Sequence, residues 1–81
     1  MKDEMIKSIA KELRILRIEN DCSQEELANK SKLAQSSIVR YERGIEDMKL
    51  STLAQMIESY GIDLYIFFER IIAKTQTKEG E

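Results

Sequence analysis

The side chains best suited to binding a ligand lie between Ser23 and Gly44. In this segment polar and basic residues recur at the spacing of one helix face. A glutamine amide can pair with adenine, an arginine guanidinium with guanine, and a valine can contact the methyl group of thymine. The pattern therefore indicates a face that reads base edges in DNA, although an ordinary solvated face has a similar composition. This face consists of Gln35, Ser36, Val39, Arg40 and Arg43.

Two short helices are predicted to position this face. Ser23 and Glu26 have the spacing of a capping box, so the first helix is expected to begin at about Gln24. Cys22 and Leu27 are placed to form the hydrophobic staple that fixes the entry angle of the chain. The buried stripe of this helix is predicted to be Leu27, Ala28 and Ser31.

The second short helix is predicted from about Gln35 to Arg43, and Gly44 is expected to end it in a left-handed cap. Ser37 falls near the edge between its two faces. Its inward face is predicted to carry Ala34, Ile38 and Tyr41.

A longer helix is predicted over about residues 3–19, where apolar residues recur at helical spacing. Arg17 lies on the same stripe and needs an anionic partner, and Glu42 lies on the inward edge of the second short helix. We therefore expect an ion pair between Arg17 and Glu42 that fastens the two helices together. The apolar stripe consists of Ile6, Ile9, Ala10, Leu13 and Leu16.

The last third of the chain predicts a helix over about residues 50–60, ended by Gly61, and a final helix capped by Asp63. The final helix carries more apolar side chains than a domain of this size is expected to bury, which favours a dimer interface. The alternative is that these residues complete the core. The predicted interface consists of Leu64, Phe67, Phe68, Ile71 and Ile72.

Length and composition favour one small all-helical domain. The chain has 81 residues, of which 42% are hydrophobic and 35% charged, and it contains no proline. Residues 1–74 are expected to form the domain and residues 75–81 a disordered tail. No segment has the pattern of a secretory signal or a membrane span, so a cytoplasmic protein without a membrane partner is expected.

The formal net charge of −2 is unusual for a protein that binds DNA without sequence preference. The charge is unevenly distributed along the chain. Residues 30–43 carry four basic side chains and a single acidic one, Glu42. Residues 44–63 are acidic, and they include an acidic loop at residues 45–47. We therefore expect weak non-specific affinity, greater reliance on base contacts and a modest dependence on salt.

Catalysis, a metal site and a bound cofactor are not expected. Cys22 is the single cysteine and histidine is absent, so neither a disulfide within one chain nor a familiar zinc site can be assembled. No nucleophile–base pattern and no phosphate-binding glycine loop is evident. A redox role for Cys22 is an alternative to its place in the staple.

Residues 13–68 resemble the lambda-repressor/Cro family of helix-turn-helix regulators, also called the XRE family. The resemblance implies a compact five-helix all-α domain in which the second and third helices form the helix-turn-helix. It also implies that Gln24 contacts a DNA phosphate at the start of the second helix. The segments that carry the likeness are Leu13 and Arg14 with Arg17, residues 23–28, residues 36–44, and residues 50–53 running to residues 61–64.

The resemblance and the helix geometry together assign the site residues. Base readout is expected from Gln35, Ser36, Val39 and Arg40. Phosphate contacts are expected from Ser23, Gln24, Lys32, Ser37, Arg43 and Lys49.

Two positions depart from the family pattern. Lys32 stands where the family has its usual turn glycine, so this lysine is expected to adopt a positive φ. Ala34 stands where the family has a capping serine, and alanine offers no side-chain oxygen. The turn is therefore expected to be less stable than the family norm.

Within the family, the chain resembles the controller proteins of restriction–modification systems in its compact size, in residues 17–19 and in residues 67–69. This likeness implies a homodimer that binds a pseudo-palindromic operator in its own promoter region, with RNA polymerase as a further partner if it activates. The alternatives are a phage-type repressor, or an antitoxin or adaptor whose main role is to bind a protein.

Overall fold

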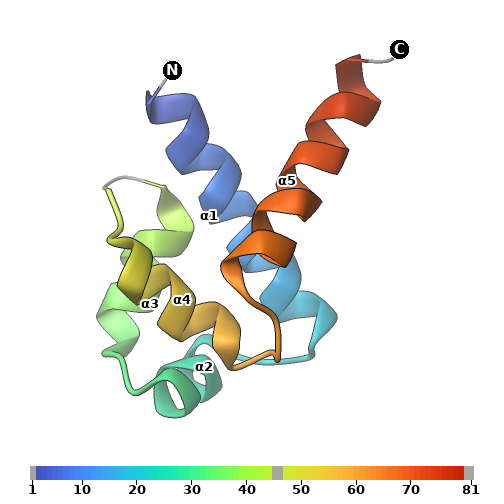
Figure 1. Ribbon diagram of the computed structural model, residues 1–81. Coiled ribbons are helices and arrows are strands. Elements are labelled where there is room, and N and C mark those ends of the chain that lie inside the picture. Colours follow the sequence, from blue (N-terminus) through green and yellow to red (C-terminus); the bar gives the residue numbers. More distant parts are fainter. Residues whose placement is uncertain (1, 45–46, 80–81) are drawn as a thin grey trace.

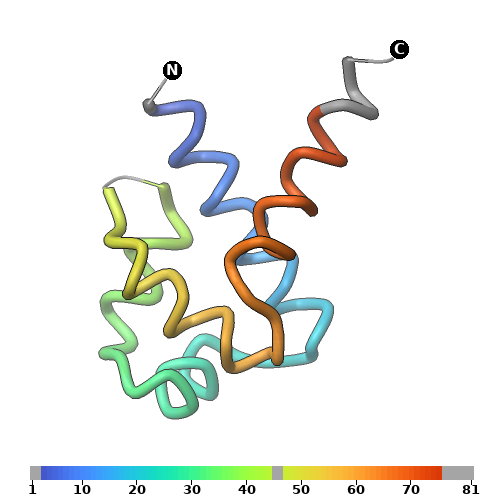
Figure 2. The backbone as a smooth tube through the Cα atoms, viewed as in Figure 1, coloured from blue at the N-terminus to red at the C-terminus, as the bar shows by residue number. Residues whose placement is uncertain are grey.

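The computed structural model describes residues 2–44 and 47–79 and contains five helices there. They are α1 (Lys2–Glu19), α2 (Gln24–Ser31), α3 (Gln35–Arg43), α4 (Leu50–Glu58) and α5 (Leu64–Glu79). Helices α2, α3 and α4 cluster on one side of α1, and α5 returns alongside α1 in the opposite direction (Figure 1). The start of α1 and the end of α5 splay apart, as the backbone tube in Figure 2 shows. The predicted five-helix all-α fold is confirmed for the described residues.

The predicted capping box at the start of α2 is confirmed. The Ser23 hydroxyl accepts the Glu26 N–H at 3.0 Å, and the Ser23 N–H donates to the Glu26 carboxylate at 2.8 Å. These bonds to Ser23 lower the pKa of the exposed Glu26 carboxyl. Cys22 and Leu27 are both buried in the core, where the staple places them. The entry of the chain into α2 is thus fixed by local sequence.

Both expected weaknesses of the turn between α2 and α3 are present. Lys32 has φ 62° and ψ 33°, which is the left-handed conformation. Ala34 is the N-cap of α3 and makes no side-chain hydrogen bond to it. At the other end of α3, Gly44 has φ 69°, and a Cβ there would lie 3.2 Å from the Cβ of Ala10. Glycine therefore permits both the left-handed cap and the close approach of α3 to α1.

Replacing Lys32 by glycine is expected to raise the free energy of unfolding by about 0.5–1 kcal/mol. Removing the Cβ relieves a left-handed strain of about 1–2 kcal/mol, and the greater freedom of glycine in the unfolded chain offsets part of this gain. Urea denaturation of the variant beside Lys32→Ala is the measurement. The alanine variant keeps the Cβ and therefore the left-handed strain. If the glycine and alanine variants are equally stable, residue 32 is not strained by its Cβ.

The hydrophobic core lies where α1, α2, α3, α4 and the first turns of α5 meet. Phe67, Ile38, Met56 and Ile57 have no exposed surface. On α1, Ala10, Leu13 and Leu16 are buried as predicted, whereas Ile6 and Ile9 are half-buried near the splayed end. The remaining buried apolar residues are Cys22, Leu27, Ala28 and Leu53.

Helix ends differ from the predicted ones in two places. Helix α4 ends at Glu58, and two turn residues follow it before Gly61, whose φ of 78° makes it the predicted terminator. Helix α5 begins with the predicted Asp63 cap, which accepts the Ile66 N–H at 3.0 Å. It extends to Glu79, into the segment 75–81 that was expected to be a tail.

Some sequence predictions fall outside the described residues. They concern Met1, Ile45 and Glu46 of the acidic loop, and Gly80 and Glu81 of the tail. Among the described helices, none combines the length and apolarity required to cross a lipid bilayer.

Candidate nucleic-acid interface

Helix α3 presents the predicted reading face to solvent. Gln35, Ser36 and Arg40 are exposed, and Val39 is half-buried beside them. Ile38, on the opposite side of the helix, has no exposed surface. The amphipathic pattern of α3 is therefore used as the sequence predicts, with the apolar side in the core and the polar side available to a ligand.

The expected phosphate-contacting residues surround this face on three segments. Ser23 lies at the start of α2, Lys32 in the turn and Lys49 at the start of α4, and all three are exposed. On α3, Arg43 is exposed and Ser37 half-buried. These side chains are therefore at least partly accessible to solvent.

Gln24 has a partner that the sequence did not predict. Its side-chain amide donates to Glu42 Oε1 at 3.2 Å, and the residue is half-buried. The amide is therefore oriented by the protein before any ligand arrives. Sequence spacing does not reveal this bond, because it joins the start of α2 to the last turn of α3.

The ion pair expected between Arg17 and Glu42 is present and joins α1 to α3. Arg17 Nε lies 2.8 Å from Glu42 Oε2, and Arg17 Nη2 donates to Glu42 Oε1 at 3.1 Å. The third guanidinium nitrogen donates to the Cys22 carbonyl at 3.0 Å. The Glu42 side chain is 3% exposed and that of Arg17 is 17% exposed, so the pair is largely desolvated. Glu42 raises the pKa of Arg17 by accepting its hydrogen bonds.

Arg14 makes a second attachment of α3 to α1. Its guanidinium donates to the backbone carbonyl of Glu42, one of the carbonyls at the end of α3 that have no partner within the helix. Glu42 is thus held through its carboxylate by Arg17 and through its carbonyl by Arg14. Arg14 precedes Arg17 by three residues and lies on the same side of α1, and that spacing is the signal that could have found it.

The apolar residues of α5 divide into a buried and a surface set. Phe67 is fully buried, so its assignment to the dimer interface is corrected: it completes the core, with its ring 5.6 Å from that of Phe68 in an edge-to-face arrangement. Ile72 is exposed. The remaining predicted interface residues, Leu64, Phe68 and Ile71, are partly buried against the core.

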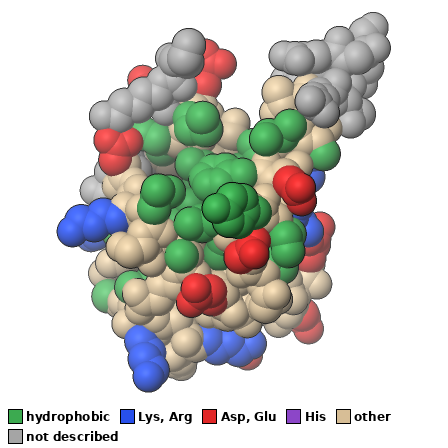
Figure 3. Space-filling model, in the orientation of Figure 1, with side chains coloured by type: hydrophobic (Ala, Val, Ile, Leu, Met, Phe, Trp, Pro, Cys, Tyr) green, Lys and Arg blue, Asp and Glu red, His purple; other side chains and the backbone are tan. Residues whose placement is uncertain are grey.

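An apolar groove runs between the splayed ends of α1 and α5. It has a volume of about 470 Å³, and Figure 3 shows hydrophobic side chains gathered on the face where the two helices diverge. Met5, a large exposed apolar residue that lines this groove, was absent from the predicted interface. Tyr65, in the first turn of α5, is exposed and was also absent from it. The residues that line the groove are Glu4, Met5, Ser8, Phe68, Ile71, Ile72 and Thr75.

The described residues contain no cluster of three or more cysteine, aspartate or glutamate side chains that could hold a metal ion. Among them, the Tyr60 hydroxyl is buried without a hydrogen-bond partner, and its burial raises the pKa of that group. Tyr60 follows α4 and belongs to the protein interior behind the reading face.

Comparison with known proteins identifies similar chains. A family model described as helix-turn-helix matches residues 13–67. The cryptic phage CTXphi transcriptional repressor RstR of Vibrio cholerae is 35% identical over 52 residues, which are 64% of this chain and 47% of RstR. The chain thus spans about half the length of that relative.

Solved structures of the restriction–modification controller protein C.Esp1396I share the fold. The wild-type structure superposes with a TM-score of 0.81 and 24% identity, over 89% of this chain and 94% of that chain. A mutant of the same controller superposes with a TM-score of 0.82, at the same identity and coverage.

Proposed function

The chain belongs to the helix-turn-helix family of XRE-type DNA-binding regulators, and on that premise we propose that it binds a pseudo-palindromic operator as a homodimer and controls its own expression. The supporting observation is the geometry of α3. Its polar face is exposed, while Arg17 and Arg14 hold its last turn against α1. A recognition helix held rigidly in this way loses little conformational entropy when it enters the major groove.

In this proposal base edges are read by Gln35, Ser36 and Arg40, with Val39 available for a thymine methyl group. Register on the duplex comes from phosphate contacts. The exposed N-terminal end of α3, which lacks a side-chain cap, enters the groove first. The phosphate-contacting residues are Ser23, Gln24, Lys32, Ser37, Arg43 and Lys49.

The proposed dimer uses the surface where α5 and α1 diverge. One recognition helix reads too few base pairs to select a site in a genome, and a two-fold dimer doubles the sequence that is read. Small domains also gain stability from association. The proposed interface consists of Met5, Leu64, Tyr65, Phe68, Ile71 and Ile72, with Phe67 supporting it from the core.

We infer that the protein is an autoregulatory controller of a restriction–modification system. The support is its agreement in size and shape with C.Esp1396I, whose chain it covers almost entirely. A phage-type repressor is the second candidate, and the sequence likeness to RstR favours it. The neighbouring genes distinguish the two, because a controller accompanies a methyltransferase and an endonuclease, whereas a repressor accompanies phage genes.

Selection from a random pool of DNA duplexes tests the DNA-binding proposal. The wild-type protein is expected to enrich a motif with two-fold symmetry. Arg40→Ala and Gln35→Ala are each expected to weaken binding to that motif by about 1–3 kcal/mol and to relax preference at one position per half-site. Lys11→Ala, which removes an exposed charge on α1 away from the reading face, is the matched control and is expected to leave the motif unchanged.

The outcome that would overturn the proposal is a folded wild-type protein that enriches no motif at low or moderate salt. The main role of the chain would then be to bind a protein, as in an antitoxin or adaptor. If a motif is found, its occurrence upstream of the chain's own gene tests autoregulation.

A further inference from the structure

Charged side chains join the middle of α5 to α1. Glu12, on α1, is 2% exposed, and its two carboxylate oxygens each accept a bond of 2.6 Å, one from Arg70 and one from Lys74. Arg70 also bonds Glu19, near the end of α1, at 2.6 Å. We call these four residues, Glu12, Glu19, Arg70 and Lys74, the α5 clamp. Glu12 raises the pKa of Arg70 by accepting its hydrogen bond.

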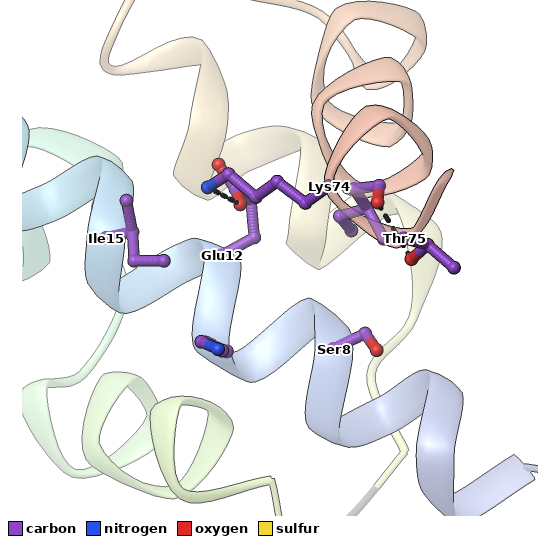
Figure 4. Close-up of a pocket in the computed structure, with 7 residues that line it drawn as sticks. Ser8, Glu12, Ile15, Lys74 and Thr75 are labelled. Atoms are coloured by element: carbon purple, nitrogen blue, oxygen red, sulfur yellow. Dashed lines mark hydrogen bonds and ion pairs between the residues drawn. The ribbon is translucent and has the colours of Figure 1, made fainter. Parts of the chain in front are cut away.

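Two hollows adjoin this part of α5, so close packing holds it less tightly than the first turns, where Phe67 is fully buried. One is the apolar groove of about 470 Å³, which no clamp residue lines. The other is a cavity of about 180 Å³ that Glu12 and Lys74 of the clamp line together with Ser8 and Ile15. Figure 4 shows the Lys74 side chain extending across this cavity to Glu12. Beyond Phe67, which is fully buried, the apolar residues of α5 are only partly buried or exposed.

Apolar contacts and charged hydrogen bonds constrain a helix differently. Apolar burial depends on area and has no preferred direction, so it permits α5 to tilt over the surface of α1. A bond from an arginine or lysine to a carboxylate requires a defined distance and direction. The α5 clamp therefore restrains the direction in which α5 leaves the domain, in addition to the packing of its first turns.

We propose that the α5 clamp sets the separation of the two operator half-sites. The inference rests on the proposed function, in which α5 carries the second copy of the chain. The proposed interface on α5 runs from Leu64 to Ile72, a helix length of about 12 Å, so a tilt of about 10° displaces Ile72 by about 2 Å. One base pair corresponds to a displacement of about 3.4 Å and a rotation of about 34° along the duplex. Such a tilt is a substantial fraction of one base-pair step, so loss of the clamp is expected to broaden the range of spacers that the dimer binds.

The test measures spacing separately from sequence recognition. The selected half-site is placed in two inverted copies, separated by every spacer up to about one helical turn, and the pool is bound and sequenced. Wild-type protein is expected to enrich one spacer by about tenfold over its neighbours. The double variant Glu12→Met with Arg70→Met replaces the two charged side chains by apolar ones of similar length and so removes the directional bonds. Its enrichment of the preferred spacer is expected to fall to about twofold, while the half-site sequence that it selects stays unchanged.

Two further variants keep the result interpretable. Glu69→Gln removes an exposed carboxylate of α5 that lies outside the clamp, so this control is expected to keep the wild-type spacer. If the methionine variant does not fold or dimerise, as judged by thermal melting and sedimentation, Glu12→Gln with Arg70→Gln provides a neutral polar pair. A clamp variant that dimerises and retains the sharp wild-type spacer overturns the inference alone. A wild-type protein with no preferred spacer overturns both the inference and the proposed dimeric operator.

Discussion

Replacing Arg17 by alanine is expected to lower the free energy of unfolding by about 3–5 kcal/mol. The substitution leaves the Glu42 carboxylate, which is 3% exposed, with the Gln24 amide as its remaining side-chain donor. A buried charge without a cationic partner keeps most of its desolvation cost. A domain of this length is stable by only about 4–12 kcal/mol, so this loss is a large fraction of its total stability. Urea denaturation followed by circular dichroism is the measurement.

A double variant distinguishes the cost of leaving one charge buried without its partner from the cost of losing the whole ion pair. Arg17→Met with Glu42→Met removes both charges and retains apolar volume, and it is expected to recover most of the stability lost in Arg17→Ala. At its last turn the recognition helix keeps only the bond from Arg14 to the main-chain carbonyl of residue 42, so affinity for the selected motif is expected to fall even though the protein is folded. An Arg17→Ala protein as stable as wild type would contradict the role assigned to the pair.

Replacing Phe67 by alanine is expected to cost about 3–5 kcal/mol of unfolding free energy, because the aromatic ring is fully buried and its removal leaves a cavity. Ile72→Glu is the matched variant on the same helix. Ile72 is 52% exposed, so its effect on the stability of the monomer is expected to be within about 0.5 kcal/mol. A charge placed in an apolar interface is instead expected to dissociate the dimer.

Sedimentation and thermal melting at several protein concentrations distinguish these effects. Phe67→Ala is expected to lower the melting temperature at every concentration, whereas Ile72→Glu is expected to remove the concentration dependence and to yield a folded monomer. If Ile72→Glu remains dimeric with unchanged affinity, the interface lies elsewhere. If Phe67→Ala melts as the wild type does, the assignment of Phe67 to the core is wrong.

Local features of this protein could be predicted from its sequence because neighbouring residues determine them. The Ser23 capping box, the left-handed Lys32, the uncapped Ala34 and the Gly44 terminator all depend on the conformational preferences of single residues and their nearest neighbours. The exposed face of α3 follows from helical periodicity in the same way. The Arg17–Glu42 pair spans 25 positions, yet it could be predicted because a cation on a buried stripe requires a partner.

The end of α5 was harder to predict, since polar composition alone does not stop a helix. Residues 75–81 were assigned to a disordered tail on composition, whereas α5 extends to Glu79, and glutamine, lysine and glutamate in this segment have favourable helix propensity. The periodicity of α5 likewise indicated which residues are apolar, but it did not indicate which of them the other helices cover.

The sequence by itself therefore determined the helices, their caps and the face of α3 that is available to DNA. Only the tertiary structure decided that Phe67 lies in the core, that Gln24 and Arg14 converge on Glu42, and that Glu12 binds Arg70 and Lys74. These contacts join residues on different helices, and their formation depends on the angles at which the helices pack. Those angles result from the fit of many side chains at once, which no local pattern in the chain encodes.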